Sequence, residues 1–376
     1  MPMRVLMISK ACVVGAYQTK LERLARAGDI ELLVVVPPAW REGQRTLALE
    51  RAYTTGYRLE VEPIVFNGSF HFHFYPRLGR RMREFAPDIV HIDEEPYNWA
   101  TAHALLLAKR YGAHALWFSW QNLYRRYPPP FWLIERYTLT HADYALVGSE
   151  GAAAVWRRKG YTGPLAVIPQ FGVDTSLYAP HPGVLAHAGR FVVGYAGRLV
   201  PEKGVDLLLK ACAGLRAPFR VRIAGEGPER PRLEALARRL GLAERITFEG
   251  RVPSLHMPDF YRSLDVLVMP SRSRPNWVEQ FGRALVEAMA CGVAVVGSDC
   301  GEIPSVVGSR GLIFPEGNAE ALRGCLQHLA EHPAARAELA ERGRARVVAH
   351  YTQEQVAART AAVYREMLGT ARRKGG

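Results

Sequence analysis

Two glutamates and two cations form the most specific chemical pattern in this chain. Glu279 and Glu287 stand eight residues apart in the run VEQFGRALVEAMACGVAVVGSDCGEIP. Arg198 and Lys203 stand five residues apart in the run GRLVPEKG. Carboxylates accept hydrogen bonds from sugar hydroxyls, and the guanidinium and ammonium groups neutralise phosphate oxygens. These residue types together predict a binding site for a sugar nucleotide.

The glycines beside these charges fit the same interpretation. Gly197 ends an apolar run and allows a ligand to approach the backbone. Gly282 stands where a helix is predicted to begin, and the free N–H groups of a helix start attract a pyrophosphate. Glu279, just before this helix, is placed to meet a sugar. Glu287, about a turn and a half inside it, is placed to accept two vicinal ribose hydroxyls.

A purely structural interpretation of the same residues is open. Arg198 and Lys203 could be solvated cations in a loop. Glu279 could be an acid that favours the helix dipole, and Glu287 a solvated helix residue. However, Glu287 is embedded in the otherwise apolar run LVEAMA, and a buried carboxylate needs partners. The two motifs together therefore favour the functional interpretation.

Short apolar runs alternate with longer amphipathic stretches, which predicts an α/β fold. Buried parallel strands are predicted at residues 4–9, 30–36, 88–92, 145–148, 191–197, 219–225, 245–250, 265–271, 293–299 and 311–314. Residues 171–190 carry Gly, Pro and Asp without periodicity, as a linker would. We expect two Rossmann-like domains, 1–175 and 176–351, that face each other across a cleft, with ligands at the carboxyl ends of the strands. A helix over about 352–370 is expected to pack back on the first domain.

The composition of the chain limits the classes of partner that it could bind. The formal charge of +13 indicates attraction to polyanions, but no helix-turn-helix or zinc-knuckle spacing is present, so we expect no nucleic-acid partner. The stretches HFHFYPRLGRRMREF and NLYRRYPPPFWLIERY combine cations with aromatic residues. Such stretches can contact an anionic membrane peripherally, and they equally fit core aromatics with solvated arginines.

The cysteines and the apolar runs indicate location. Five scattered cysteines without CxxC spacing predict reduced thiols in a cytoplasmic protein. The apolar run near the N-terminus is short and is interpreted as a first strand, not as a signal peptide. No stretch reaches the roughly 18 apolar residues of a membrane span. We therefore expect a cytoplasmic protein, with the inner face of the membrane as its peripheral contact.

The order of these motifs resembles the retaining GT-B glycosyltransferases of family 4, also called glycosyl transferases group 1. The specific matches lie in the second half, in the runs GRLVPEKG, IAGEGPE, FEGRVP, DVLVMPS, CGVAVVGSDCGEIP and GLIFPEGN and in the E-x7-E pair of Glu279 and Glu287. The first half matches more loosely, through APDIVHIDEEP, ADYALVGSE and VIPQFGVD. The resemblance therefore covers nearly the whole chain.

The resemblance implies a role for each matching residue. Arg198 and Lys203 would neutralise the diphosphate of the leaving nucleotide. Glu287 would hold the ribose, and Glu279 would contact the hydroxyls of the donor sugar. Further donor contacts, near the base, the sugar and the diphosphate, would come from Gly15, Gly197, Gly225, Arg251, Val252, Phe281 and Gly282. Family members need no metal, and the chain has no DxD motif, so we expect neither a metal nor another cofactor.

The first domain departs from the family's pattern at one position. Many members place a histidine near the sugar after the fifth strand, where this chain has Gln121 and Asn122. Both amides can hydrogen-bond a sugar, but neither titrates. His91, Glu94 and Glu95 are the other candidates for contacts with a sugar or an acceptor. His91 could equally be a hydrogen-bonded residue at a strand end, and the two glutamates could face water.

The resulting hypothesis is the transfer of a hexosyl group from a nucleotide-diphosphate sugar, with retention at the anomeric carbon. A UDP-sugar is favoured over a GDP-sugar as donor. The acceptor would be a saccharide or a lipid-linked molecule in polysaccharide, glycolipid or cell-envelope biosynthesis. Two alternatives stay open, a sugar-nucleotide epimerase of the same architecture and a catalytically silent, membrane-associated binding module.

Overall fold

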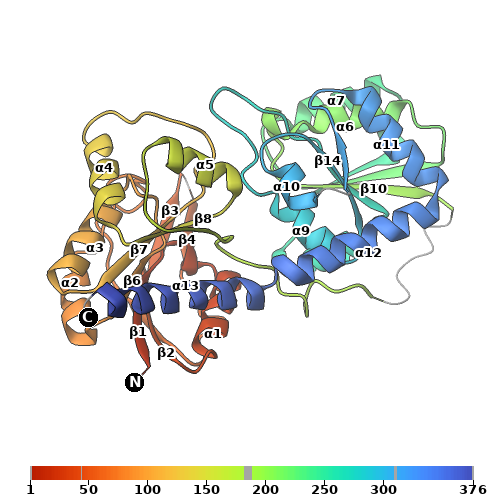
Figure 1. Ribbon diagram of the computed structural model, residues 1–376. Coiled ribbons are helices and arrows are strands. Elements are labelled where there is room, and N and C mark those ends of the chain that lie inside the picture. Colours follow the sequence, from red (N-terminus) through yellow and green to blue (C-terminus); the bar gives the residue numbers. More distant parts are fainter. Residues whose placement is uncertain (1, 44, 182–188, 309–310, 375–376) are drawn as a thin grey trace. The chain divides into compact units, whose positions relative to one another are not determined.

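The chain folds into two compact units, one formed by Met1–Gly172 with Gln353–Gly376 and the other by Val173–Thr352 (Figure 1). The computed structural model describes residues 2–43, 45–181, 189–308 and 311–374. The chain leaves the first unit after Gly172, where the sequence predicts residue 175, and it returns at Gln353. Each unit is an α/β structure and is described by itself.

The first unit is built on a seven-stranded sheet. The strand order is β5-β2-β1-β6-β7-β8-β9, and every neighbouring pair is parallel. The strands are β1 (Met3–Ile8), β2 (Ile30–Val36), β5 (Arg58–Val61), β6 (Ile89–Ile92), β7 (His114–Ser119), β8 (Tyr144–Val147) and β9 (Leu165–Val167). Apolar runs such as VLMI and LLVVV form the central strands because their side chains are buried on both faces.

Helices cover both faces of this sheet (Figure 1). They are α1 (Thr19–Ala25), α2 (Leu78–Phe85), α3 (Trp99–Arg110), α4 (Phe131–His141), α5 (Glu150–Arg158) and α13 (Gln353–Lys374). Successive side chains of a strand point to opposite faces. Val5 and Met7 of β1 accordingly pack in the core that α1 and α13 cover, and Leu6 and Ile8 pack in the core that α2 and α3 cover.

A hairpin that the sequence does not predict stands apart from the sheet. Its strands are β3 (Ala39–Glu42) and β4 (Arg45–Ala48), and they pair antiparallel. Both strands are short and mostly exposed, so they lack the apolar pattern that marks the others. The buried side chain of the hairpin is Trp40, whose ring meets that of His73 edge-on at 5.0 Å. This contact ties the hairpin to the body of the first unit.

The second unit repeats the plan with six parallel strands in the order β12-β11-β10-β13-β14-β15. They are β10 (Phe191–Ala196), β11 (Phe219–Ala224), β12 (Ile246–Gly250), β13 (Val266–Met269), β14 (Ala294–Ser298) and β15 (Leu312–Phe314). One face carries α6 (Val205–Ala213), α7 (Arg230–Arg239) and α11 (Ala319–Glu331). The other carries α8 (Met257–Arg262), α9 (Arg283–Ala290), α10 (Ile303–Val307) and α12 (Pro333–His350).

Each sheet has one point where its strand order reverses. In the first unit this point lies between β1 and β6, and in the second it lies between β10 and β13. All strands of these two large sheets are parallel, so the carboxyl ends of the strands in one sheet share one edge, and the loops that follow the two strands at the switch point diverge there. Short 3-10 helices occupy several of the loops of the two units, at Ala11–Val13, Gly15–Gln18, Pro201–Lys203, Ala243–Arg245 and Ser254–His256. Ligands of such folds bind in the crevice that this divergence leaves.

Helix α13 completes the core of the first unit. Tyr364 is fully buried, and its Oη lies 2.6 Å from Nδ1 of His91, with which it shares a hydrogen bond. Outside the core, Arg365 binds both carboxylate oxygens of Asp29 at 2.7 and 2.9 Å. The C-terminal helix therefore belongs physically to the first unit, although the whole second unit separates it from that unit in the sequence.

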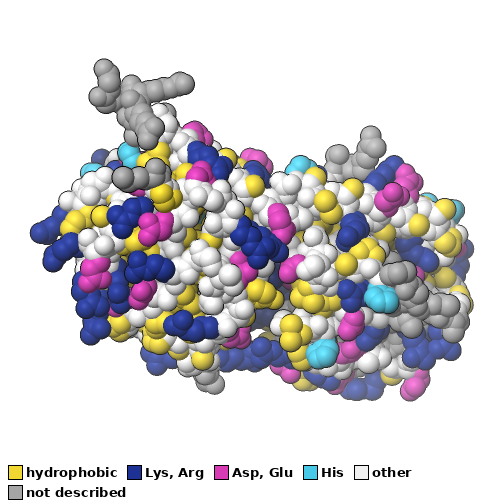
Figure 2. Space-filling view, turned by 90° about the horizontal axis from the view of Figure 1, so that it is seen from below, with side chains coloured by type: hydrophobic (Ala, Val, Ile, Leu, Met, Phe, Trp, Pro, Cys, Tyr) yellow, Lys and Arg dark blue, Asp and Glu magenta, His cyan; other side chains and the backbone are white. Residues whose placement is uncertain are grey.

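The face of the molecule drawn in Figure 2 carries its positive charge in a dispersed form. Lys and Arg side chains are scattered over the face drawn in Figure 2, with acidic side chains among them. No helix in the described part of the chain is both long and apolar enough to pass through a membrane. All five cysteines are free thiols, and four of them are buried.

We expect Tyr364→Ala to lower the free energy of unfolding by about 3–5 kcal/mol, because it leaves a cavity in the core and removes the partner of His91. Tyr364→Phe keeps the ring and should cost only about 1 kcal/mol. Urea unfolding of the full chain measures both. A loss for Tyr364→Ala no larger than the loss for Tyr364→Phe would mean that α13 does not complete this core.

Candidate nucleotide-sugar site

The two charged motifs of the second unit meet at its switch point. Gly204 ends the loop after β10 with a φ of 67°. A Cβ at this position would lie 1.9 Å from the carbonyl oxygen of Pro270, the residue that directly follows β13. This close approach of two backbones brings Lys203 beside the loop that carries Glu279.

Lys203 and Glu279 form an ion pair. Nζ of Lys203 lies 2.6 Å from Oε2 of Glu279, and the Ser271 hydroxyl donates to the same oxygen at 3.1 Å. Glu279 is only 7% exposed, and Nζ lies 4.9 Å from the ring centroid of Trp277. Partial burial strengthens the attraction and raises the cost of separating the charges. Glu279 therefore already orients the Lys203 ammonium group before any phosphate binds to it.

The loop after β14 holds the backbone of Glu279. The amide of Glu302 donates to the carbonyl oxygen of Glu279 at 3.1 Å. Gly301 has a φ of 55°, and a Cβ there would lie 2.3 Å from the same oxygen. The run CGEIP therefore positions the acid, a function that sequence reasoning did not assign to it.

Glu287 lies inside α9 and is buried, so it is not a solvated helix residue. Its Oε2 accepts a hydrogen bond from the Tyr261 hydroxyl at 2.8 Å, and its Oε1 accepts one from Nε of Arg283 at 2.7 Å. Each carboxylate oxygen can accept a second hydrogen bond, so capacity for a ligand hydroxyl is left. Burial, together with Glu287, raises the pKa of Tyr261 well above its ordinary value, which keeps this hydroxyl a donor.

Glycines join the ends of three neighbouring strands. Gly225, directly after β11, has a φ of 144°, and a Cβ there would lie 1.8 Å from the carbonyl oxygen of Gly197. Its amide donates to the carbonyl oxygen of Gly250 at 2.7 Å. Side chains at these positions would push the strand ends apart. The edge of the sheet is therefore lined by backbone, which a ligand can approach closely.

The remaining predicted donor residues line the same edge of the second unit. Arg198 follows Gly197 after β10; its side chain is exposed and its carbonyl oxygen accepts a hydrogen bond from the Tyr195 hydroxyl at 2.8 Å. Arg251 is exposed after β12, and Val252 is partly buried beside it. Phe281 contacts Tyr351 edge-on at 5.6 Å, and Gly282 begins α9 with a φ of 75°.

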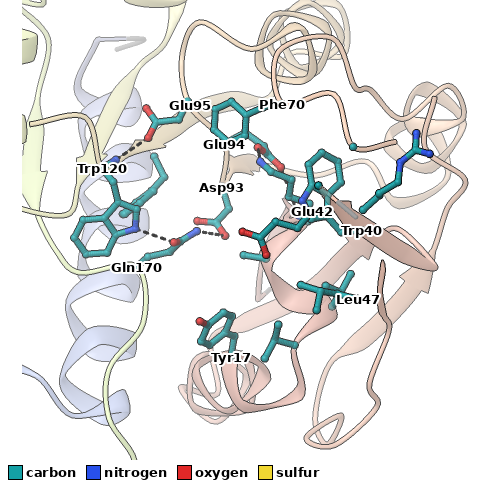
Figure 3. Close-up of a pocket in the computed structure, with 18 residues that line it drawn as sticks. Tyr17, Trp40, Glu42, Leu47, Phe70, Asp93, Glu94, Glu95, Trp120 and Gln170 are labelled. Carbon is teal, nitrogen blue, oxygen red and sulfur yellow. Dashed lines mark hydrogen bonds and ion pairs between the residues drawn. The ribbon is translucent and has the colours of Figure 1, made fainter. Parts of the chain in front are cut away.

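The first unit has a pocket of about 450 Å³ at its own switch point (Figure 3). Two of the predicted acids, Glu94 and Glu95, line it beside Asp93. Glu94 pairs with Lys10 and lies 3.4 Å from Nε2 of His73. The loops after β1 and β6 thus hold a second pair of lysine and glutamate.

The three acids have different electrostatic surroundings. Burial raises the pKa of Glu94, but Lys10 and His73 outweigh it and bring this pKa to about 2. Burial raises the pKa of Glu95 to about 7, although the Ser119 hydroxyl and the Trp120 amide donate to its two oxygens at 2.5 and 2.9 Å. Burial also raises the pKa of Asp93. Glu95 therefore exchanges its proton near neutral pH, while Glu94 stays ionised.

The lining of this pocket does not include His91, Gln121 or Asn122. For His91 the structure supports the second interpretation, a hydrogen-bonded residue of a strand, whereas a sugar contact of Gln121 and Asn122 stays a prediction. His91 points to α13, because residues alternate between the faces of a strand, and it is completely buried. Burial lowers its pKa well below the ordinary value. Gln121 is buried as well, and its side-chain amide donates to the carbonyl oxygen of Leu123 at 2.9 Å.

Gly15 is already bound to an acid. Its amide donates to Oε2 of Glu50 at 2.7 Å, and a Cβ at Gly15 would lie 2.9 Å from that oxygen. The backbone position that the sequence analysis assigns to a diphosphate thus carries a carboxylate here. A phosphate could use this amide only after Glu50 had moved.

Several residues that build the two sites were missed. Tyr261 and Ser271 hold the predicted glutamates, but nothing in their sequence spacing marks them as partners. Lys10 and Trp40 reach the pocket of the first unit from a loop and from the unpredicted hairpin. Asp93 could have been found, because it immediately precedes Glu94 and Glu95 at the end of a predicted strand.

The fold occurs among solved structures. HepE from Anabaena, solved in complex with UDP, matches with a TM-score of 0.74 and 20% identity over 97% of this chain and 100% of that chain. At this identity the likeness concerns the fold alone. With two Rossmann-like units, the chain has the GT-B fold.

Two family models match the chain in succession. Residues 18–177 match the model described as Glycosyltransferase Family 4, and residues 181–346 match the model described as Glycosyl transferases group 1. The chain therefore belongs to family 4 of the glycosyltransferases. The predictions of family and fold class are confirmed.

Curated relatives match over shorter stretches. A GDP-mannose-dependent alpha-(1-6)-phosphatidylinositol monomannoside mannosyltransferase of Mycolicibacterium smegmatis is 33% identical over 198 residues, 48% of this chain and 52% of that protein. A D-inositol 3-phosphate glycosyltransferase of Streptomyces bingchenggensis is 31% identical over 254 residues, 62% of this chain and 54% of that protein. The chain thus spans about half the length of these relatives.

Gly204→Ala should destabilise the chain more than Gly241→Ala. Both glycines have a similar φ, 67° and 69°, but a Cβ at Gly241 meets no atom within 4 Å. The shared backbone strain costs about 1–2 kcal/mol, and the contact with Pro270 should add about 1–3 kcal/mol at Gly204. Urea unfolding of both variants measures the difference. Equal losses would show that the two loops can separate without cost.

Glu94→Gln should change the acid dependence of stability. The pKa of Glu94 falls from 4.5 to about 2 on folding, so its contribution is present above pH 4.5 and is lost as the pH falls toward 2. The shift corresponds to roughly 3 kcal/mol. We expect the variant to be less stable near neutral pH and to lose less stability on acidification in urea unfolding.

The rim residue Glu42, whose side chain is exposed, provides the control for this measurement. Glu42→Gln should change stability by at most about 0.5 kcal/mol at either pH. If Glu94→Gln behaved in the same way as Glu42→Gln, the pairing of Glu94 with Lys10 would not stabilise the fold.

Proposed function

We propose that the chain transfers a hexosyl group from a nucleotide-diphosphate sugar to a saccharide or lipid-linked acceptor, with retention at the anomeric carbon. The observation that carries this proposal is the partly buried ion pair of Lys203 and Glu279 at the switch point of the second sheet. A cation for phosphate and an acid for sugar hydroxyls stand there side by side. Membership of the glycosyltransferase family supports the same reaction.

Different residues of the second unit would bind different parts of the donor. Arg198, Lys203 and the start of α9 would neutralise the diphosphate, so that we propose transfer without a metal ion or other cofactor. Glu279 would hold hydroxyls of the donor sugar, and Glu287 would hold the ribose. Gly225 and the residues after β12 would flank the base.

The reaction exchanges one bond at the anomeric carbon for another. The bond from this carbon to the diphosphate oxygen breaks, and its electron pair stays on the diphosphate, where Arg198 and Lys203 stabilise it. The acceptor oxygen forms the new bond on the same face through an oxocarbenium-like transition state. The proton of the acceptor hydroxyl passes to the departing diphosphate. Glu279 is assigned no covalent role.

A UDP-sugar is the favoured donor, and a GDP-sugar is the second choice. The HepE structure was solved with UDP, but its likeness to this chain concerns the fold alone and does not decide the base. The mycobacterial relative, whose name specifies GDP-mannose, supports a GDP-sugar as the alternative donor. Base recognition at this edge is largely through backbone, which either nucleotide could use.

We also propose that the protein works in the cytoplasm and touches an anionic membrane peripherally. Large aromatic and aliphatic side chains are exposed on the first unit at Phe66, Phe70, Phe72, Trp132 and Leu133. Arginines flank them in the sequence, and Arg80 is among the exposed ones. Exposed aromatic residues with nearby cations suit the interface of an anionic bilayer.

Thermal-shift and hydrolysis measurements with UDP-, GDP- and ADP-sugars test the proposal. We expect one nucleotide family to stabilise the chain and to be released slowly as free nucleotide. Lys203→Ala should lower this turnover by about 100- to 1,000-fold, because one preorganised charge contact to the leaving group is lost. Lys210→Ala is the matched control, since Lys210 is an exposed lysine of the same unit paired with Asp206.

If the Lys203→Ala and Lys210→Ala variants turned over equally fast, Lys203 would not contact the diphosphate. Stabilisation by a sugar nucleotide without any release would favour the silent binding module. If none of these sugar nucleotides stabilised the chain, the proposed function would be wrong.

A further inference from the structure

A second cavity of the first unit lies between α1 and α13 and has a volume of about 410 Å³. The two helices lie side by side in Figure 1, and Leu24 of α1 and Val356 of α13 belong to one core. The cavity shares no lining residue with the pocket of Figure 3, and none of the residues assigned to the donor lines it. Its volume nevertheless lies in the range of small-molecule sites.

The lining of this α1–α13 cavity combines small apolar residues with cations. Four of its residues are alanines, and two of these are buried. Apart from Glu354, every charged side chain of the lining is an arginine, namely Arg23 of α1, Arg26 directly after it and Arg365 of α13. An anion in the cavity would therefore meet guanidinium groups from both sides.

Each of these arginines already has an acidic partner. Arg365 binds both carboxylate oxygens of Asp29, and Nη2 of Arg26 lies 3.5 Å from Oε2 of Glu22. Asp29 and Glu22 do not line the cavity, but with them and Glu354 the charges of the arginines are balanced. Each guanidinium, however, carries more N–H donors than these contacts use. An added oxyanion would thus find donors without breaking the pairs with Asp29 and Glu22.

Arg23 is the arginine whose partner is easiest to replace. Its Nε lies 2.6 Å from Oε1 of Glu354, but this N–H is buried and makes no hydrogen bond among the described residues. A buried donor without an acceptor is costly. The side chain of Glu354 is 54% exposed, so its carboxylate can move into water at little cost. Glu354 therefore occupies the place that the oxygen of an anionic ligand would take.

We propose that the α1–α13 cavity binds a phosphate monoester, with its phosphate on the three arginines in place of the Glu354 carboxylate and its organic part against the alanines. Phosphate oxygens accept hydrogen bonds from several guanidinium groups at once, and arginine matches their geometry. Once Glu354 has turned away, the charged groups left in the lining are Arg23, Arg26 and Arg365. The bound phosphate would join α1 to α13. This site is independent of the proposed transfer reaction.

Isothermal titration calorimetry on the full chain tests the site with inorganic phosphate and with glycerol 3-phosphate. We expect both to bind with a dissociation constant of about 1 mM or lower, whereas neutral glycerol should not bind. Lys203→Ala is titrated in parallel, because the proposed diphosphate site would also attract phosphate. Binding to the α1–α13 cavity should be unchanged in that variant.

Substitutions in the lining locate the binding. Arg23→Gln and Arg26→Gln should each weaken phosphate binding about tenfold, because a charge-assisted hydrogen bond is lost. Arg110→Gln is the matched control, since Arg110 is an exposed arginine at the end of α3 that does not line the cavity. Glu354→Gln should tighten binding about threefold, because the competing carboxylate loses its charge.

Thermal unfolding checks that each variant is folded. The Arg26 side chain is 60% exposed, so Arg26→Gln tests the site even if Arg23→Gln does not fold. Three results would overturn the proposed site: no binding of either phosphate, binding that Lys203→Ala removes, or binding that Arg26→Gln affects no more than Arg110→Gln does. Glu354→Gln with an unchanged or lower affinity would also overturn it, because Glu354 would then not occupy the place of the ligand.

The same phosphate chemistry occurs in free metabolites and in lipid headgroups, and phosphatidic acid carries the glycerol phosphate group on a membrane. Sedimentation with phosphatidylcholine vesicles that contain phosphatidic acid distinguishes these sources. Sedimentation that Arg26→Gln abolishes would uphold the site and identify a lipid headgroup as its ligand. Binding of glycerol 3-phosphate without sedimentation would uphold it as a site for a free phosphorylated metabolite.

Discussion

The proposed donor site depends on close contacts between backbones that only glycine allows. Gly204 brings the loop after β10 against Pro270, and Gly225 lies against the carbonyl oxygen of Gly197. Without these approaches the loops would stand apart, and Lys203 could not reach Glu279. The charged side chains carry the chemistry, but their separation is set by residues without side chains. Glycine spacing is therefore as much a part of this site as the acids and cations.

Both units contain a lysine–glutamate ion pair at the switch point, but the charged residues around the pair differ. Each places a lysine after one strand of its switch point and a glutamate after the other, as Lys10 with Glu94 and Lys203 with Glu279. In the second unit the exposed Arg198 adds positive charge, which suits a diphosphate. In the first, Asp93 and Glu95 add carboxyl groups, and burial raises the pKa of both. The balance of the neighbouring charges therefore distinguishes the two sites, more than the pair itself.

The sequence predicts the family and the six strands of the second unit well, because apolar runs and short motifs report local structure. It does not predict β5, β7 and β9 of the first unit, and the roles of the charged residues stay predictions. It does not predict partners that only the fold brings together, such as Tyr261 for Glu287 across 26 residues. The hairpin that contains Trp40 is not predicted from the sequence, because its strands are short and mostly exposed. The sequence leaves two interpretations of His91 open because one residue of register decides which face of a strand a side chain occupies, and the structure turns it to Tyr364 of α13. Motif position identifies candidates, and strand geometry then decides which of them reach a pocket.

The return of α13 to the first unit has a consequence for the order of folding. Tyr364 and His91 are separated by 273 residues, yet they share a buried hydrogen bond. A ribosome releases the sheet of the first unit long before it releases this helix, while the second unit is contiguous and can close as soon as it has emerged. The nascent first sheet thus keeps an uncovered apolar face through most of synthesis, and long-range contacts of this kind form slowly. The domain that is made first is the one that finishes last.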